Sequence, residues 1–178
     1  MTEEYLSMTL REFKRLQRLA EDALAQLPAE AFFSAPAPGD NSLAVIVKHV
    51  GGNLLSRWTD FLSSDGEKPN RDRDAEFLIL ADDSRERLMD QWNRGWAALF
   101  DALSPLQAAD LNRTVTIRGE QLSVLQAINR QLTHYAYHVG QIVYVAKHFA
   151  GAQWTSLSIP VGASKQFNQA PAKYVTKV

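Results

Sequence analysis

The sequence predicts an all-α fold, a four-helix bundle within a single domain that spans residues 1–178. Three observations carry this prediction. Four stretches repeat apolar residues every three or four positions, as amphipathic helices do. Breaks rich in proline, glycine or charged residues separate these stretches. The length of 178 residues is enough for one domain with its own core, and a long second connection indicates at least one crossover.

The first two predicted helices cover residues 2–26 and 42–63. Pro28 ends the first, and a loop with the sequence SAPAPGD follows it. Asp40, Asn41 and Ser42 are suitable N-cap residues for the second helix. The apolar stripes of the two helices are Leu6, Leu10, Phe13, Leu16, Ala20, Leu24 and Leu27, and then Leu43, Ile46, Val47, Val50, Leu54, Trp58 and Phe61.

The connection over residues 63–77, SSDGEKPNRDRDAEF, is polar and contains the helix breakers Gly66 and Pro69. Its charge predicts that it lies outside the core. We expect a solvated crossover loop, and the alternative is a loop that covers a functional site.

The second half of the chain continues with a third helix over residues 83–103, whose core candidates are Leu88, Trp92, Trp96 (or Gly95) and Leu99. Residues 111–124 alternate apolar and polar side chains around Gly119, which predicts a small hairpin. The fourth helix covers residues 123–150 and stops at Gly151, a natural C-terminal glycine. The tail beyond it shows no period, so we expect it to wrap the surface or to join a partner.

The composition excludes several function classes. The formal net charge of −1 gives no basic field for nucleic acid or an anionic membrane. No apolar run reaches the roughly 20 residues of a membrane span, and the N-terminus lacks a signal pattern. The chain has no cysteine, which excludes disulfides, thiolate nucleophiles and Cys-ligated zinc. We expect a cytoplasmic protein.

Three of the four histidines are predicted to point inward. His134 and His138 lie one turn apart on one face of the fourth helix, within the string HYAYHVGQI. His49 falls on the buried side of the second helix, three residues after Ile46. His148 lies near a helix C-terminus, where a surface position is the better interpretation.

Two interpretations of the inward histidines remain open from the residues alone. They are packed core residues satisfied by hydrogen bonds, or they are ligands of one divalent metal ion. Three neutral imidazoles favour zinc, nickel or another late first-row ion, and they leave a coordination position open for substrate.

A histidine in VIVKHVGGNLLSRWTDFL combined with an HxxxH pair in the fourth helix resembles the DinB/YfiT-like superfamily of four-helix metalloproteins. The longer strings NSLAVIVKHVGGNLLSRWTDFLSSDGEKPNRDRDAEF and AINRQLTHYAYHVGQIVYVAKHFAG, followed by WTSLSIP, are similar to one bacterial branch of it. The likeness runs over residues 41–160, and more loosely over the whole chain.

The resemblance implies a bundle of down-up-up-down topology, often homodimeric, that binds zinc or nickel through His49, His134 and His138. Characterised relatives include thiol-dependent S-transferases and isomerases that use bacillithiol, mycothiol or glutathione. The width of the apolar arc on the fourth helix and the four tryptophans independently favour a homodimer, since one small bundle does not readily hide them.

The sequence therefore favours a metal-dependent enzyme, either a thiol-dependent S-transferase or a related transferase or hydrolase. The ion would act as a Lewis acid that lowers the pKa of a thiol or a water molecule. Because the chain has no cysteine, a thiolate would come from a small-molecule cosubstrate. The alternatives are a non-catalytic, stress-related dimer held by metal, and a protein whose histidines bind no metal.

Candidate substrate or supporting contacts are Asn53, Arg57 and Gln131, which lie one or two helical turns from a histidine. Arg57 is a candidate partner for the carboxylate of a small-molecule thiol, and a surface salt bridge is the competing interpretation. Asp60 and Glu76 are possible general bases, but no spacing supports them.

Overall fold

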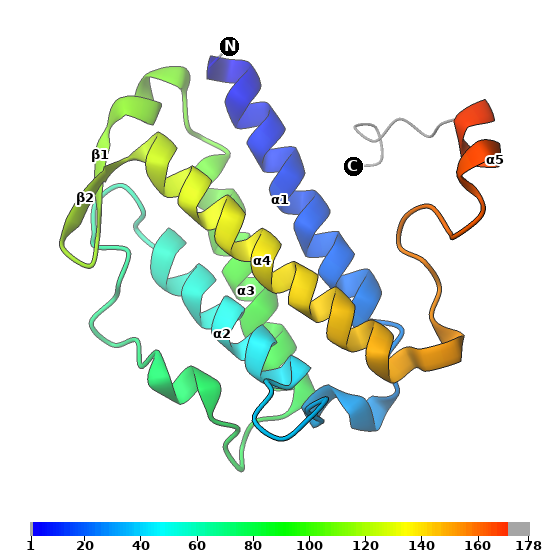
Figure 1. Cartoon of the computed structure of the whole chain (residues 1–178). Coiled ribbons are helices and arrows are strands. Elements are labelled where there is room, and N and C mark those ends of the chain that lie inside the picture. Colours follow the sequence, from blue (N-terminus) through cyan, green and yellow to red (C-terminus); the bar gives the residue numbers. More distant parts are fainter. Residues whose placement is uncertain (1, 171–178) are drawn as a thin grey trace.

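The computed structural model is mostly helical with one small antiparallel hairpin, and it describes residues 2–170 (Figure 1). Its four long helices are α1 (Thr2–Leu24), α2 (Leu43–Trp58), α3 (Arg85–Leu103) and α4 (Val124–Ala150). The hairpin strands are β1 (Thr114–Ile117) and β2 (Glu120–Ser123). The short helices are η1 (Ala29–Phe33), η2 (Asp74–Phe77), η3 (Ala108–Asn112), η4 (Gly151–Gln153) and α5 (Ser164–Gln169).

The long helices lie side by side, and the hairpin covers one end of them (Figure 1). Helix α2 packs mainly on α3, and α1 packs mainly on α4. Helix α2 also contacts α4, which brings the face of α2 that carries His49 towards the face of α4 that carries His134. None of the helices within residues 2–170 is long and apolar enough to cross a membrane.

Side-chain caps explain where three of the long helices begin. The hydroxyl of Ser42 accepts a hydrogen bond from the backbone N–H of Val45, as predicted for the start of α2. Ser84 caps α3 in the same way. Ser123 and Gln126 form a reciprocal capping box at the start of α4. The predicted starts of these helices are therefore correct to within two residues.

The core contains the predicted apolar stripes and a group of aromatic rings. Phe13 makes edge-to-face contacts with Trp58, Trp96 and Tyr135. The hydroxyl of Tyr135 accepts a hydrogen bond from Nε1 of Trp58 at 3.0 Å. Trp58, Trp92 and Trp96 are buried within this chain, so these three tryptophans need no second subunit to cover them, whereas Trp154 is partly exposed. The homodimer stays a prediction.

Helices α2 and α3 approach closely because small residues face each other. A Cβ on Gly95 would lie 2.7 Å from Cβ of Leu54 and 3.1 Å from the carbonyl oxygen of Gly51. A Cβ on Gly51 would in turn lie 3.3 Å from the backbone nitrogen of Trp92. Helix α2 is thus fixed rigidly on one side, while its opposite side carries His49.

The predicted end of the second helix at residue 63 is wrong. The structure ends α2 at Trp58, because Thr59 is extended and Asp60 takes a left-handed conformation with φ of 50°. The hydroxyls of Ser63 and Ser64 then donate to the carbonyl oxygen of Asp60 and hold the turn. The apolar side chain of Phe61 is still buried, which explains why the stripe extends beyond the helix.

The predicted hairpin turn lies at Arg118 and Gly119, both with positive φ. The carboxylate of Asp65 accepts hydrogen bonds from the backbone N–H groups of both turn residues, at 2.8 Å each. The hairpin is therefore fastened to the connection between α2 and α3. In the tail, Trp154 and Leu157 pack against the core, in agreement with a wrapping segment, and residues 171–178 lie outside the described part.

Candidate metal centre

The three predicted inward histidines come together between α2 and α4. Each of His49, His134 and His138 offers a ring nitrogen, and these three atoms lie within 4.8 Å of one another. Among residues 2–170 this is the one group of three or more His, Asp or Glu side chains close enough to hold a metal ion. His49 is buried, whereas His134 and His138 are partly exposed, so the centre lies at the edge of the helix pair.

His134 and His138 lie one turn apart on α4, so their rings meet with 4.7 Å between centroids and nearly perpendicular planes. Their Nε2 atoms are 3.1 Å apart. Nδ1 of His138 lies 2.8 Å from Oε1 of Gln141, whose amide nitrogen donates to the hydroxyl of Tyr137. Because an amide oxygen only accepts, His138 carries its proton on Nδ1 and keeps a lone pair on Nε2.

His49 is held by a carboxylate from the connecting segment. Its Nδ1 lies 2.8 Å from Oε2 of Glu76 in η2, and both side chains are less than a tenth exposed. The ring of Phe77 lies against the imidazole, with 4.8 Å between centroids. Since Nδ1 donates to Glu76, the free nitrogen of His49 is Nε2.

Glu76 is itself fixed by Arg71 through a two-point ion pair. Nε and Nη2 of Arg71 donate to Oε1 and Oε2 of Glu76 at 2.8 Å each. The carboxylate lies directly against the backbone of α2 at Gly52, where a Cβ would collide with Oε1. Glycine at this position therefore lets the carboxylate approach His49, which precedes Gly52 by about one turn.

The electrostatics of the pair on α4 keep both imidazoles neutral. Burial, together with the charges of His138, His49, Arg57 and Arg71, lowers the pKa of His134 to about 3. Burial also lowers the pKa of His138 to about 4, against the opposing effect of its hydrogen bond to Gln141. Neutral imidazoles are the form that binds metal.

The donor set fits a divalent ion. Zinc bonds of about 2.0–2.1 Å to imidazole place tetrahedral ligand atoms about 3.3 Å apart, and the 3.1 Å between Nε2 of His134 and of His138 is close to this spacing. Nδ1 of His134 is buried without a hydrogen-bond partner, so no protein acceptor fixes the orientation of this ring. Three nitrogen donors without a thiolate suit several first-row divalent ions, zinc and nickel among them.

The three predicted contact residues, Asn53, Gln131 and Arg57, are all buried but have different hydrogen-bond partners. Asn53 is buried and its Oδ1 accepts a hydrogen bond from the hydroxyl of Tyr135, so it is part of the core. Gln131 is buried one turn before His134, and its Oε1 has no partner. Its role towards a substrate stays a prediction.

Arg57 is buried and paired. Its Nη1 donates to a carboxylate oxygen of Glu67 at 2.8 Å and also to the carbonyl oxygen of Gly66. Burial lowers its pKa, an effect that Glu67 opposes. The predicted salt bridge is therefore present, although inside the protein and not on its surface, and a substrate contact for Arg57 stays a prediction.

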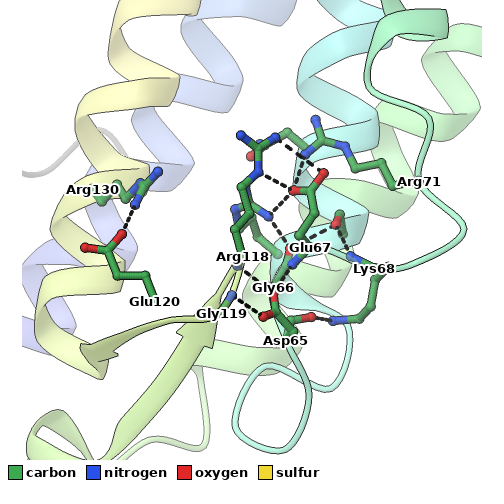
Figure 2. A network of polar contacts seen from close by, with 12 residues as sticks. Asp65, Gly66, Glu67, Lys68, Arg71, Arg118, Gly119, Glu120 and Arg130 are labelled. Atoms are coloured by element: carbon green, nitrogen blue, oxygen red, sulfur yellow. Dashed lines mark hydrogen bonds and ion pairs between the residues drawn. The ribbon is translucent and has the colours of Figure 1, made fainter.

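Glu67 joins three arginines into one network beside the centre (Figure 2). It accepts from Arg57, from Arg71 at 3.1 Å and from Arg118 at 3.4 Å. Burial alone would raise the pKa of Glu67, but the hydrogen bonds from Arg57 and Arg118 and the charge of Arg71 outweigh it and lower the pKa to about 2. A continuous chain of ion pairs thus leads from the hairpin to His49.

The preferred interpretation of residues 63–77 as a solvated loop outside the core is wrong for Gly66, Arg71 and Glu76. The side chains of Arg71 and Glu76 are 5% and 8% exposed, and Gly66 is buried. Burial is possible because the charges neutralise one another, which composition does not reveal. Of the two possible bases, Glu76 is buried and contacts a histidine, whereas Asp60 is exposed. Both line one pocket of about 480 Å³, together with Arg71.

Comparison with known families gives one result. The model of the family described as "Protein of unknown function (DUF1572)" matches residues 1–163. No curated protein matches the chain.

Proposed function

The chain belongs to the DUF1572 family, and we propose that it is a metal-dependent enzyme whose centre consists of His49, His134 and His138. The observation that carries the proposal is the convergence of three imidazole nitrogens within 4.8 Å from two helices. The resemblance to DinB/YfiT-like metalloproteins supports it and adds the bundle topology down-up-up-down. Zinc or nickel is the proposed ion.

The arrangement suits catalysis because one side of the centre remains accessible. His49 is buried and held by a carboxylate, whereas His134 and His138 are partly exposed. A closed structural zinc site uses four protein ligands, and three leave a position for a substrate. When bound, a divalent ion supplies Lewis acidity, which makes a thiol or water nucleophilic near neutral pH.

We propose that the side chains around the centre orient the imidazoles and keep them neutral. Glu76 and Gln141 orient the imidazoles of His49 and His138 through their Nδ1 atoms. Burial keeps His134 and His138 neutral, so their lone pairs are available. The arginines of the adjacent network are each paired with Glu67 or Glu76, so they fix the segment that holds His49.

A low-molecular-weight thiol is the proposed cosubstrate, and S-transfer or a related transferase or hydrolase reaction is the proposed chemistry. The chain contains no cysteine, so a thiol nucleophile must come from outside the protein. The protein is also proposed to act as a homodimer, a statement that sedimentation tests: a 19.9 kDa species at micromolar concentration contradicts it.

The test of the metal centre is elemental analysis of protein purified without a histidine tag and loaded with zinc or nickel. We expect about one ion per chain in the wild type and less than about 0.1 in His138→Ala. The control is His148→Ala, which removes an exposed histidine from the same helix and should leave metal content unchanged. Wild-type protein that retains below about 0.1 ion per chain would overturn the proposal.

Enzymatic function is then tested with a panel of thiols against electrophiles. Turnover by the loaded wild type and none by His138→Ala supports the enzyme. Metal binding without turnover by bacillithiol, mycothiol or glutathione, and without hydrolysis, would instead favour a non-catalytic metal-binding protein.

A further inference from the structure

We propose that Glu76 is the positioning residue of the metal centre, and that it sets both the tautomer and the direction of His49. The inference rests on the proposed metal site and adds to it a residue that is not a ligand. Among the three imidazoles, His49 is the one with a carboxylate on its second nitrogen. A carboxylate on Nδ1 fixes the tautomer of the imidazole, so Nε2 is the nitrogen that faces the centre.

The hydrogen bond between His49 and Glu76 has a defined direction, from the imidazole to the carboxylate. A carboxylate offers acceptors alone, so the proton of the 2.8 Å contact resides on Nδ1 of His49. Both oxygens of Glu76 also accept hydrogen bonds from Arg71, so neither oxygen is a donor to His49. Nε2 of His49 therefore carries the lone pair.

The carboxylate of Glu76 is held in place by its neighbours. Glu76 is 6% exposed, its two oxygens accept three hydrogen bonds, and the backbone at Gly52 borders Oε1. A rotation of this side chain would break the ion pair with Arg71. Glu76 is accordingly unsuited to exchange protons with a substrate, and its role is to orient His49.

The other two proposed ligands have no carboxylate on their second ring nitrogen. His138 has a neutral amide on Nδ1, and Nδ1 of His134 has no partner. Those two rings lie on one helix, whose geometry already places them one turn apart. His49 comes from a different helix, so its direction depends on a contact that the helix itself does not supply.

The test compares zinc affinity in two single variants of the same ion-pair network. Glu76→Gln removes the charge that contacts His49, and Glu67→Gln removes the neighbouring charge but leaves the contact between Glu76 and His49 intact. We expect Glu76→Gln to weaken zinc binding about 10- to 100-fold, as loss of a carboxylate behind a histidine ligand does. Glu67→Gln should stay within about threefold of the wild type.

A second readout does not need metal. Long-range ¹H–¹⁵N spectra of the metal-free wild type should show His49 protonated on Nδ1, with a slowly exchanging proton that Glu76→Gln loses or exposes to faster exchange. Should Glu76→Gln fail to fold, Glu76→Asp keeps the charge beside Arg71 but shortens the reach to His49, and it should also weaken zinc binding.

The outcomes separate this inference from the proposed function. Wild type that binds zinc, together with Glu76→Gln that binds equally well, overturns the role of Glu76 and leaves the metal site standing. Equal losses in Glu67→Gln and Glu76→Gln overturn it too, because the effect would then come from the segment as a whole. A proton on Nε2 of wild-type His49 contradicts the inference directly, whereas wild type without metal affinity removes both proposals.

Discussion

The carboxylate of Glu76 occupies the space that a Cβ on Gly52 would need. The neighbouring atom is the end of a side chain, which would move easily if it were free. It is not free, since Arg71 and His49 hold both of its oxygens. The contact between Glu76 and His49 therefore requires that residue 52 has no Cβ.

Gly52→Ala is expected to lower zinc affinity about tenfold, because the new Cβ displaces Glu76 from His49. A competition titration against a zinc chelator measures this. Gly140→Ala is the matched control: it makes the same change in another helix where nothing lies within 4 Å, and it should stabilise α4 by up to about 1 kcal/mol without altering zinc affinity. Equal zinc affinity of the two variants would contradict the proposed geometry.

Zinc is expected to raise the melting temperature of the protein, because an ion that binds the native state shifts the unfolding equilibrium. At a free concentration about 100 times the dissociation constant, the stabilisation is about 2.7 kcal/mol, or roughly 5–10 °C for a domain of this size. Differential scanning calorimetry with zinc and then with excess chelator measures the shift. His134→Ala should show none, and an equal shift in that variant would place the binding elsewhere.

Tyr135→Phe is expected to cost about 1–3 kcal/mol of stability while leaving zinc content unchanged. The hydroxyl of Tyr135 accepts from Trp58 and donates to Asn53, so its removal leaves two buried polar atoms without a partner. Urea unfolding measures the loss. Tyr144→Phe, at a hydroxyl on a side chain that is 77% exposed, should change nothing. A fall in zinc content of Tyr135→Phe would instead connect Asn53 to the site.

Glu67→Gln is expected to destabilise the protein by about 2 kcal/mol at pH 7, because Arg57 stays buried without its carboxylate. The pKa of Glu67 is about 2 in the native state, below its ordinary value of 4.5, so its contribution is fully present above pH 4.5 and is lost as the pH falls towards 2. The stability difference between wild type and variant should therefore shrink across this window.

The control for the pH experiment is Glu12→Gln, which removes a charge from a partly exposed ion pair with Arg15 on α1. It should differ little from the wild type at any pH, as surface ion pairs contribute little. Urea unfolding at a series of pH values measures all three proteins. A difference between wild type and Glu67→Gln that does not change with pH would show that the carboxylate acts through its shape and not its charge.

The histidines and the helix starts were predictable because each depends on local pattern. His134 and His138 share a face by their spacing, and Ser42 is a strong N-cap wherever an apolar period follows it. The end of α2 was not predictable, since Asp60 takes a left-handed conformation without glycine or proline to mark it.

The most consequential miss was the role of Glu76. Its contacts are His49, far earlier in the chain, and Arg71, five residues before it in an irregular segment with no period. The alternation of acidic and basic residues between Glu67 and Glu76 was a usable signal, because mixed charges can satisfy one another when buried. Read as composition alone, the same charges predicted exposure.

Two of the three proposed ligands come from one turn of α4, and the third comes from α2, which packs against α4. An isolated α4 already contains a two-point binding site, and packing of α2 completes it. Affinity should therefore rise in two stages as the chain folds, and metal held weakly by α4 before α2 packs would guide the order of assembly. On the proposed metal site, an ion bound by residues of both helices would favour packing of α2 on α4 and so couple metal binding to folding.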